Sequence, residues 1–384
     1  MRPRTVRRRL QGIERPRLLV VRNDGLGDFV LTLPLIAALK QRLPGAHVTV
    51  LLSAALGGLV PLLPDIDVAI PDEGVLLKRH RGRFDDAQRK ARQADLLSAV
   101  RGGGFDAALL PYAEAATARL VQQAGIPIRV GPLRRSFFWR FNAHYRRSRR
   151  GSGAAEYALN LGYLECLGLP ADYVAARLAL PDGALPPEAQ AGPYAVLHAH
   201  KRSGTALTWP LERFVALARG LVATGLTVVA VGDPPDRPVL EGVFGGVPGV
   251  CIETGLTLPR LVGLIARARL FVGNSSGPLH LAGLAGTPHV GLYPQDRVSA
   301  PERWRTLPVP GAPPDMRRYL LAPRFPKDCV VCEGPRCSYH NCVASLEPAA
   351  VWEALRAWGL ELPAAESEAP SAGGADVAGG ADPR

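Results

Sequence analysis

The chain has 384 residues, of which 47% are hydrophobic, and its formal net charge at pH 7 is +12. This length favours two domains over one core. No apolar run reaches the roughly 18–20 residues of a membrane-spanning helix, which excludes an integral helical membrane protein. The arginine-rich N-terminus lacks the apolar segment of a signal peptide, so we expect a cytoplasmic protein. The positive charge favours acidic partners: nucleic acid, an anionic membrane surface or a phosphorylated substrate.

The first half of the chain alternates between predicted strands and predicted helices. Residues 1–16 are rich in arginine and are predicted to be a disordered basic arm, either attracted to a membrane surface or solvated and inert. Beyond them, short apolar runs indicate strands and longer runs with helical spacing indicate helices. The predicted strands are residues 18–21, 47–52, 68–70, 105–110 and 128–130, and the predicted helices are residues 29–42, 85–100 and 113–124. This alternation is typical of an α/β fold, with a parallel sheet covered by helices on both faces.

The second half repeats the scheme after a proline-rich stretch. Residues 181–193 are predicted to link a first domain, residues 17–180, to a second, residues 194–360, and residues 361–384 are predicted to be a disordered tail. The predicted strands of the second domain are residues 194–197, 227–231, 270–272 and 290–293, and its predicted helices are residues 211–224, 258–268, 278–285 and 348–358. Ligands of such sheets bind beyond the carboxyl ends of the strands, so the expected site is a cleft between the two sheets.

A turn of small residues, 273–277, follows one of these strands and precedes a helix. Ser275 or Ser276 suits the N-cap of this helix, and Pro278 lies in the first turn, where its missing N–H costs nothing. The free N–H groups and the positive end of the helix dipole would then point at one spot, which suits a phosphate or diphosphate. An ordinary strand–turn–helix without a ligand fits this stretch about equally well.

A second glycine turn, residues 25–28, follows the first strand. It lacks the third glycine of a dinucleotide-binding turn, and Asp28 at the helix start would repel a diphosphate. A carboxylate that projects into a cleft is instead a candidate general base. The alternative is that Asp28 only caps its helix, a position that suits aspartate. The two glycine turns are expected to face each other across the cleft.

Four segments, in order along the chain, resemble one known family. Residues 22–34 read Arg-Asn-Asp-Gly-Leu-Gly-Asp-Phe-Val-Leu-Thr-Leu-Pro, and residues 273–282 read Gly-Asn-Ser-Ser-Gly-Pro-Leu-His-Leu-Ala. These resemble the two signatures of glycosyltransferase family 9, the ADP-heptose:lipopolysaccharide heptosyltransferases and their relatives. Residues 198–214 are similar to the family's segment after the first strand of the second domain, and residues 156–168 to its interdomain helix. The resemblance covers about residues 17–357.

The resemblance implies a GT-B fold, in which two Rossmann-like domains face each other across a cleft, with the acceptor on the first and the nucleotide-sugar on the second. It also implies transfer with inversion and without a metal. Asp28 matches the aspartate taken as the general base, which must approach opposite the departing diphosphate. Backbone N–H groups near Ser276 would stabilise that diphosphate.

Further residues of the second domain are predicted to bind the donor. Ser276, Gly277 and His280 match positions that line the family's donor site, and Asn274 and Ser275 belong to the same turn. His198, which ends a strand at the cleft, is predicted to contact the nucleotide. A last match, in a looser register, is Glu253 with the family's acidic residue for the nucleotide ribose.

Two departures from the family pattern bear on the substrate. Relatives usually carry an acidic residue, which contacts sugar hydroxyls in heptosyltransferases, where this chain has Ser275, so ADP-heptose itself is one candidate donor among others. Relatives also usually carry a lysine just before the Trp-Pro pair at Trp209. Here Lys201 or Arg202 must replace it, or that contact to the diphosphate is missing.

Residues 131–150 combine seven arginines with five aromatic residues. A solvated basic loop and a nucleic-acid surface, on which bases stack, both fit this composition. We favour a third interpretation, in which the loop meets the phosphorylated lipopolysaccharide core and anionic lipid at the inner-membrane surface, where each charge gains about 1 kcal/mol. The arginines predicted to face the acceptor or the membrane are Arg134, Arg135, Arg140, Arg146 and Arg147.

Four cysteines lie close together near the C-terminus. Cys329, Cys332, Cys337 and Cys342 have a spacing compatible with a structural zinc site. The alternative is a set of reduced thiols without a metal. No cofactor is expected for the transfer reaction in either case.

The sequence therefore predicts a cytoplasmic GT-B glycosyltransferase, peripheral to the inner membrane, that moves a sugar from a nucleotide donor to a lipopolysaccharide-core acceptor. Heptose from ADP-heptose is a candidate donor. Two rivals stay open: another GT-B enzyme of sugar nucleotides, such as an epimerase, and a non-enzymatic nucleic-acid-binding protein. We expect no nucleic-acid partner.

Overall fold

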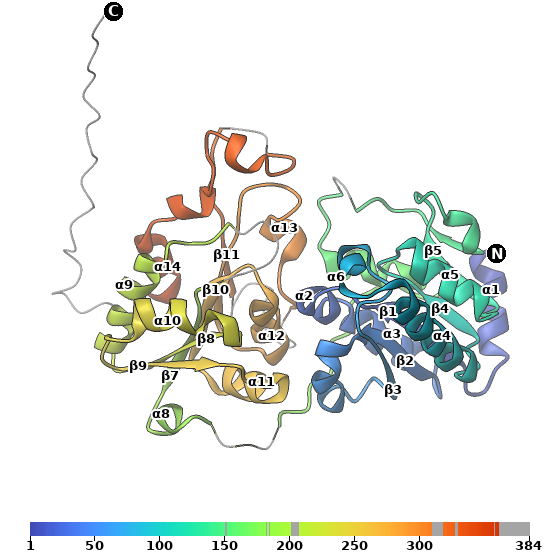
Figure 1. The fold of residues 1–384 in the computed structure, drawn as a ribbon, viewed down its shortest axis with the longest axis horizontal. Helices are drawn as coiled ribbons and strands as arrows, with labels where there is room; N and C mark the ends of the chain where they lie inside the picture. Colours follow the sequence, from blue (N-terminus) through green and yellow to red (C-terminus); the bar gives the residue numbers. More distant parts are fainter. Residues whose placement is uncertain are drawn as a thin grey trace, which may run out of the picture.

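The protein contains two six-stranded sheets, each covered by helices (Figure 1). The computed structural model describes residues 1–149, 152–181, 183, 185–200, 207–308, 318–326, 329–356 and 358–360. Within these described residues, all ten pairings between neighbouring strands are parallel. The predicted α/β class with two parallel sheets is confirmed. No described helix is long and apolar enough to cross a membrane.

The first sheet has the strand order β3-β2-β1-β4-β5-β6. Its strands are β1 (Arg17–Arg22), β2 (His47–Ser53), β3 (Val68–Asp72), β4 (Ala107–Leu109), β5 (Ile128–Pro132) and β6 (Ala143–Tyr145). The order reverses between β1 and β4, and such a switch point is where α/β sheets bind ligands. Residues 18–22 of β1 are all buried, as expected for a central strand of a parallel sheet.

The helices of the first half largely follow the prediction. They are α1 (Pro3–Gln11), α2 (Leu26–Val30), α3 (Leu33–Arg42), α4 (Asp86–Gly102), α5 (Ala115–Gln123), α6 (Glu156–Leu161) and α7 (Tyr163–Cys166), with 3₁₀ turns η1 (Ala54–Leu62), η2 (Lys78–Arg83) and η3 (Phe138–Arg140). The predicted helix 29–42 is in fact two helices, α2 and α3. Pro34 explains the break, since it has no N–H to continue a helix and instead lies in the first turn of α3.

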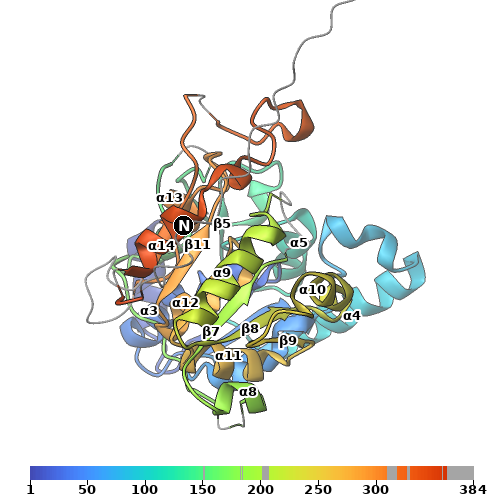
Figure 2. The same ribbon diagram turned by 90° about the vertical axis from the view of Figure 1, so that its left-hand side faces the viewer.

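The second sheet has the strand order β12-β11-β10-β7-β8-β9, which is the same arrangement as in the first sheet. Its strands are β7 (Tyr194–His198), β8 (Thr227–Gly232), β9 (Val250–Thr254), β10 (Leu270–Asn274), β11 (His289–Leu292) and β12 (Arg318–Leu321). Its helices are α9 (Leu211–Ala223), α10 (Arg237–Phe244), α11 (Leu258–Arg267), α12 (Gly277–Ala285), α13 (Pro301–Trp304) and α14 (Pro348–Arg356), with 3₁₀ turns η4 (Pro234–Asp236), η5 (Gly334–Arg336) and η6 (Cys342–Ser345). Figure 2 views the molecule from the side of this second sheet.

Three segment predictions need comment. A short helix, α8 (Pro187–Gln190), lies within the predicted linker. The predicted tail, residues 361–384, lies outside the described residues. The limits of the two predicted domains stay a prediction.

The prediction of a disordered N-terminal arm is wrong for residues 3–11, which form α1. Val6 and Leu10 are fully buried, one helical turn apart on the same face, while the arginines of the helix are exposed. The helix packs closely on the end of α7. A Cβ at Gly168, where φ is +73°, would lie 2.8 Å from the carbonyl oxygen of Pro3. The high arginine content of residues 1–16 led to the prediction of disorder, because composition alone gives no weight to the spacing of Val6 and Leu10.

Replacing Leu10 with alanine should therefore lower the free energy of unfolding by about 2–4 kcal/mol, because a buried side chain is lost from the contact with the first domain. Arg8→Ala, an exposed position on the same helix, should change it by less than about 0.5 kcal/mol. Urea denaturation of both variants measures the difference. Equal stabilities for the two would mean that α1 does not dock.

Candidate active site

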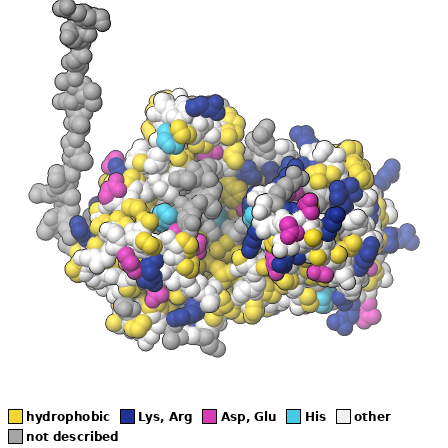
Figure 3. Space-filling model, in the orientation of Figure 1, with side chains coloured by type: hydrophobic (Ala, Val, Ile, Leu, Met, Phe, Trp, Pro, Cys, Tyr) yellow, Lys and Arg dark blue, Asp and Glu magenta, His cyan; other side chains and the backbone are white. Residues whose placement is uncertain are grey.

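A cavity of about 650 Å³ opens between the two halves of the molecule (Figure 3). The first half contributes the turn and first residues of α2 and the start of η1. The second half contributes the carboxyl ends of β7, β8 and β9, the start of α12, and residues 298–304. The cavity is thus where the sheet topology and the two glycine turns predicted it.

Two glycines allow the halves to approach each other closely beside this cavity, where α2 packs against α12. A Cβ at Gly27 would lie 2.6 Å from Cδ2 of His280, and a Cβ at Gly277 would lie 2.8 Å from Leu26. Any side chain at either position would push one helix away from the other. The glycines of the two turns therefore serve the contact between the halves as well as the turns themselves.

Asp28 lies in the first turn of α2 and lines the cavity. Its carboxylate accepts a hydrogen bond from Arg22, which also donates from Nε to Asp24 at 2.8 Å. The Asp28 side chain keeps 26% of its surface exposed to the cavity. The protein around its other sides removes water from the carboxylate, and this burial raises the pKa of Asp28 to about 6 against the opposing effect of Arg22. The carboxylate is therefore ionised at neutral pH and a stronger base than an exposed aspartate.

The turn between β10 and α12 faces Asp28 from the other half. Of the two predicted N-cap candidates, Ser276 is the N-cap of α12, but its hydroxyl does not cap the helix and instead bonds Nδ1 of His198 at 3.1 Å. Ser275, Ser276, Gly277 and His280 all line the cavity. The N-terminus of a nine-residue helix, with its positive dipole end, therefore opens into the same space as the Asp28 carboxylate.

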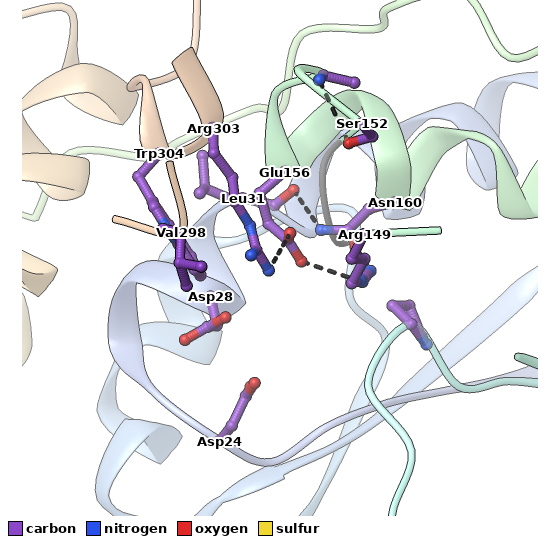
Figure 4. Close-up of polar contacts among 12 residues, drawn as sticks. Asp24, Asp28, Leu31, Arg149, Ser152, Glu156, Asn160, Val298, Arg303 and Trp304 are labelled. Carbon is purple, nitrogen blue, oxygen red and sulfur yellow. Dashed lines mark hydrogen bonds and ion pairs between the residues drawn. The ribbon is translucent and has the colours of Figure 1, made fainter. Parts of the chain in front are cut away.

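Behind Asp28 lies a cluster of buried charges around Glu156, the first residue of α6 (Figure 4). The Glu156 carboxylate lies 3.5 Å from Arg22, 3.2 Å from Arg149 and 3.4 Å from Arg303. Burial alone would raise the pKa of Glu156, but the three arginines lower it below its ordinary value. Arg22 is itself buried, and its three carboxylate neighbours keep its pKa above the ordinary value. Glu156 and Arg22 are therefore both charged at neutral pH.

Comparison with known proteins identifies the family. Residues 94–310 match the model of glycosyltransferase family 9 (heptosyltransferase). The chain belongs to this family. It is 24% identical over 282 residues to lipopolysaccharide heptosyltransferase 3 of Escherichia coli, covering 70% of this chain and 80% of that one. It is also 24% identical over 288 residues to lipopolysaccharide heptosyltransferase 1 of E. coli K12, covering 72% and 87%.

Solved structures support the same fold. An E. coli heptosyltransferase with ADP superposes with a TM-score of 0.70 at 18% identity, over 88% of this chain and 99% of that one. A family 9 glycosyl transferase from Veillonella parvula gives 0.69 at 19% identity, over 89% and 96%. The protein is therefore a glycosyltransferase with the GT-B fold of the heptosyltransferases, as the sequence predicted.

Within this family 9 glycosyltransferase, several predicted site residues do meet at one place. Asp28, His198, Glu253, Ser275, Ser276, Gly277 and His280 all line the cavity. Lys201 and Arg202 lie outside the described residues. The arginines predicted to face an acceptor or membrane, Arg134, Arg135, Arg140, Arg146 and Arg147, do not line the cavity. Any contact they make with an acceptor is therefore away from the described lining of the cavity.

The prediction that Asn274 binds the donor needs correction. Its side chain is fully buried, accepts a hydrogen bond from the backbone N–H of Trp209 at 2.9 Å, and donates to the carbonyl of Ala199 at 2.8 Å. Asn274 thus ties the loop after β7 to the end of β10. It shapes the donor turn from behind and does not face the cavity.

The zinc site that the cysteine spacing allowed, as one alternative to reduced thiols, is not preformed in the described part of this structure. Among the described residues, no three His, Cys, Asp or Glu side chains lie in an arrangement that could hold a metal ion. Cys329, Cys332, Cys337 and Cys342 instead line a separate cavity of about 430 Å³ and are not joined in disulfides. The short spacing in the sequence brings the four cysteines to one cavity without bringing their sulfur atoms into a ligand shell.

The sequence did not predict the charge cluster. Arg22 is the first residue of the family signature at residues 22–34, and no role was predicted for it, although a charged residue that closes a fully apolar strand is itself a signal of a buried ion pair. Glu156 was placed on a helix without a role. Arg303 carries no local signal, because its partner lies 147 positions earlier in the chain.

Replacing Asn274 with leucine should cost about 2–4 kcal/mol of stability, because two buried backbone groups, at Trp209 and Ala199, would lose their partner. Ser275→Ala, at the neighbouring cavity-lining position, should cost less than about 1 kcal/mol. Thermal or urea unfolding of the two variants tests this. If Asn274→Leu is as stable as the wild type, the hydrogen bonds of Asn274 to Trp209 and Ala199 do not stabilise the fold.

Proposed function

We propose that this glycosyltransferase moves a sugar from a nucleotide donor to a lipopolysaccharide-core acceptor, with inversion and without a metal ion. The observation that carries the proposal is that a carboxylate with a raised pKa and the N-terminus of α12 open into one cavity from opposite halves of the molecule. Inverting transfer needs a base on one side of the anomeric carbon and a stabilised leaving group on the other.

Asp28 is the proposed general base. As the acceptor hydroxyl oxygen forms its bond to the anomeric carbon, its proton passes to the carboxylate, and the bond from that carbon to the diphosphate oxygen breaks on the opposite face. The carboxylate is available for this at neutral pH because its pKa is about 6. Its hydrogen bond from Arg22 fixes the orientation of the side chain.

The turn at Ser276 is the proposed diphosphate site. Backbone N–H groups of the first turn of α12, together with the helix dipole, stabilise the negative charge that develops on the leaving group, so that no divalent metal is required. His198 and Ser276 form one hydrogen-bonded pair beside this turn. Glu253, which lines the cavity at the carboxyl end of β9, is the proposed partner of the nucleotide ribose.

The nucleotide is proposed to be ADP and the sugar a heptose or a close relative. Support comes from an E. coli heptosyltransferase of the same fold that was solved with ADP and with ADP-2-deoxy-2-fluoro heptose. Ser275 lines the cavity where the family usually has an acidic residue, so a sugar with one fewer hydroxyl contact fits this site.

The deciding experiment incubates the protein with ADP-heptose and a heptose-deficient lipopolysaccharide core and follows the mass of the acceptor. Asp28→Asn should reduce turnover by about 10²–10⁴-fold, the usual contribution of a general base, while the calorimetric affinity for ADP stays within about twofold. Turnover in the presence of EDTA should equal that in its absence. An equal loss of turnover and of ADP affinity in Asp28→Asn would assign Asp28 a structural role instead.

The pH dependence gives an independent check. Because the base must be ionised, the rate should fall as the pH drops through about 6, and at pH 5 about a tenth of the plateau rate should remain. A rate that stays constant down to pH 5 would rule out a base with this pKa.

The exposed arginines of the first half are proposed to hold the enzyme at the cytoplasmic face of the inner membrane. Arg134, Arg135 and Arg146 are exposed, and Phe138 and Trp139 of η3 expose 45% and 57% of their surface. Arg140 stacks on Trp139 at 4.1 Å. Exposed aromatic rings among cations suit the headgroup region of an anionic bilayer.

The basic side of α1 extends this surface. The N-terminal amino group of Met1 donates to the carbonyl of Asn142, which joins the start of α1 to the chain just after η3. The exposed arginines of this helix are Arg4, Arg7, Arg8 and Arg9, and Arg2 just before the helix is exposed as well. Figure 3 shows Lys and Arg side chains spread over the right-hand half of the molecule, which contains the first sheet.

Co-sedimentation with lipid vesicles tests this surface. The protein should bind vesicles that contain phosphatidylglycerol and not vesicles of phosphatidylcholine alone, and Trp139→Ala with Arg134→Gln and Arg135→Gln should weaken binding at least tenfold. Each interfacial cation contributes about 1 kcal/mol of binding free energy. The loss of two arginines therefore exceeds the roughly 1.4 kcal/mol that a tenfold weaker affinity requires. Turnover of a delipidated acceptor should stay unchanged. Equally tight, salt-sensitive binding to DNA would point to the nucleic-acid alternative.

A further inference from the structure

One contact joins the second half of the molecule directly to the charges behind Asp28. Arg303, on the short helix α13, places Nη2 3.4 Å from Oε2 of Glu156 on α6. Arg303 also lines the cavity, and its guanidinium stacks on Trp304 at 5.1 Å. Figure 4 shows Arg303 reaching from the second half toward Glu156, beside Asp28.

The other partners of Glu156 come from the first half. Arg22 and Arg149 contact the second carboxylate oxygen, Oε1. Oε1 of Glu156 therefore pairs with arginines of the first half, and Oε2 pairs with an arginine of the second half. The buried carboxylate can keep all its partners only while the loop that carries α13 is seated against the first half.

The charges of the cluster balance only when Arg303 is present. Three carboxylates, those of Asp24, Asp28 and Glu156, meet three guanidinium groups, those of Arg22, Arg149 and Arg303. Without Arg303, two cations would face three anions in a site shielded from water, where an uncompensated charge is costly.

We propose that Arg303 is a positioning residue that, by binding Glu156, couples the seating of the 298–304 loop to the readiness of Asp28 to accept a proton. The proposal rests on the role of Asp28 as the general base. While Arg303 holds one oxygen of Glu156, Arg22 remains available to Asp28. When Arg303 departs, Glu156 draws more strongly on Arg22, and the excess negative charge favours a protonated, inactive Asp28.

The remaining neighbours of Asp28 do not replace the positive charge that Arg303 supplies to Glu156. On its own turn, Asp24 adds negative charge and opposes ionisation. From α12, the His280 ring lies against Gly27. Tyr112 lies with its ring 5.9 Å from the Arg22 guanidinium. Among the described groups around Asp28, Arg303 is the cation contributed by the second half, so it is the one that domain movement would add or remove.

The test is the pH profile of kcat/KM in charge-changing variants. In Arg303→Gln the acid limb should move up by about one pH unit, so that activity falls about fivefold at pH 6 and approaches the wild-type value near pH 8.5. Glu156→Gln removes the anion instead and should move the limb to lower pH. Arg303→Lys, which keeps the charge, should restore most of the wild-type profile.

Arg305→Gln is the matched control. Arg305 lies just after α13 and bonds only the carbonyl of Glu302 among the described groups, so its loss should leave the profile unchanged. Calorimetric affinity for ADP and a thermal melt show which variants are folded. Should Glu156→Gln fail to fold, Arg303→Gln and Arg303→Lys still give the sign of the shift.

The outcomes separate this inference from the proposed function. If Arg303→Gln lowers activity by the same factor at every pH, the residue is merely structural and the coupling is wrong, even where Asp28→Asn abolishes turnover. If Asp28→Asn keeps wild-type turnover, the base assignment itself fails. Opposite shifts of the acid limb in the Arg303 and Glu156 variants are the result that the coupling requires.

Discussion

The buried guanidinium of Arg22 is the constraint on which the site depends. Arg22 is the last residue of the apolar strand β1, at the carboxyl edge of the first sheet, and its burial there keeps water away from the guanidinium. A buried cation is tolerated only when anions surround it, and Asp24, Asp28 and Glu156 fill that need. The orientation of the Asp28 side chain, and hence the position of the proposed base, follows from its ion pair with Arg22.

The second constraint is the distance between the halves. Gly27 and Gly277 remove the side chains that would separate α2 from α12, and the cavity opens beside this contact. A site divided between two sheets needs a way to hold them at one spacing. Here the glycines allow the approach, and the Arg303–Glu156 ion pair adds an attraction across it.

The parts of the site that sequence could predict are those whose signals are local. An apolar strand followed by glycine and a helix start locates Asp28 and the Ser276 turn, because every residue of the signal is adjacent in the chain. The role of Asn274 could not be read in this way, since its partners, Trp209 and Ala199, belong to a loop about 70 residues earlier. The Glu156–Arg303 pair is the same case, and the buried pair Val6 and Leu10 of α1 was masked by the arginines around it.

The balanced charges of the site also explain where the net charge of +12 belongs. The cluster around Glu156 holds equal numbers of acidic and basic groups and contributes nothing to that excess. The exposed arginines of α1 and of the chain around η3 do contribute to it, and they do not line the cavity. Exposed charges are screened over about 8 Å at physiological salt, so a basic surface for anionic lipid can coexist with a base whose pKa is set by its burial and its buried neighbours. The proposed base and the proposed membrane-binding arginines thus occupy separate parts of the same half of the molecule.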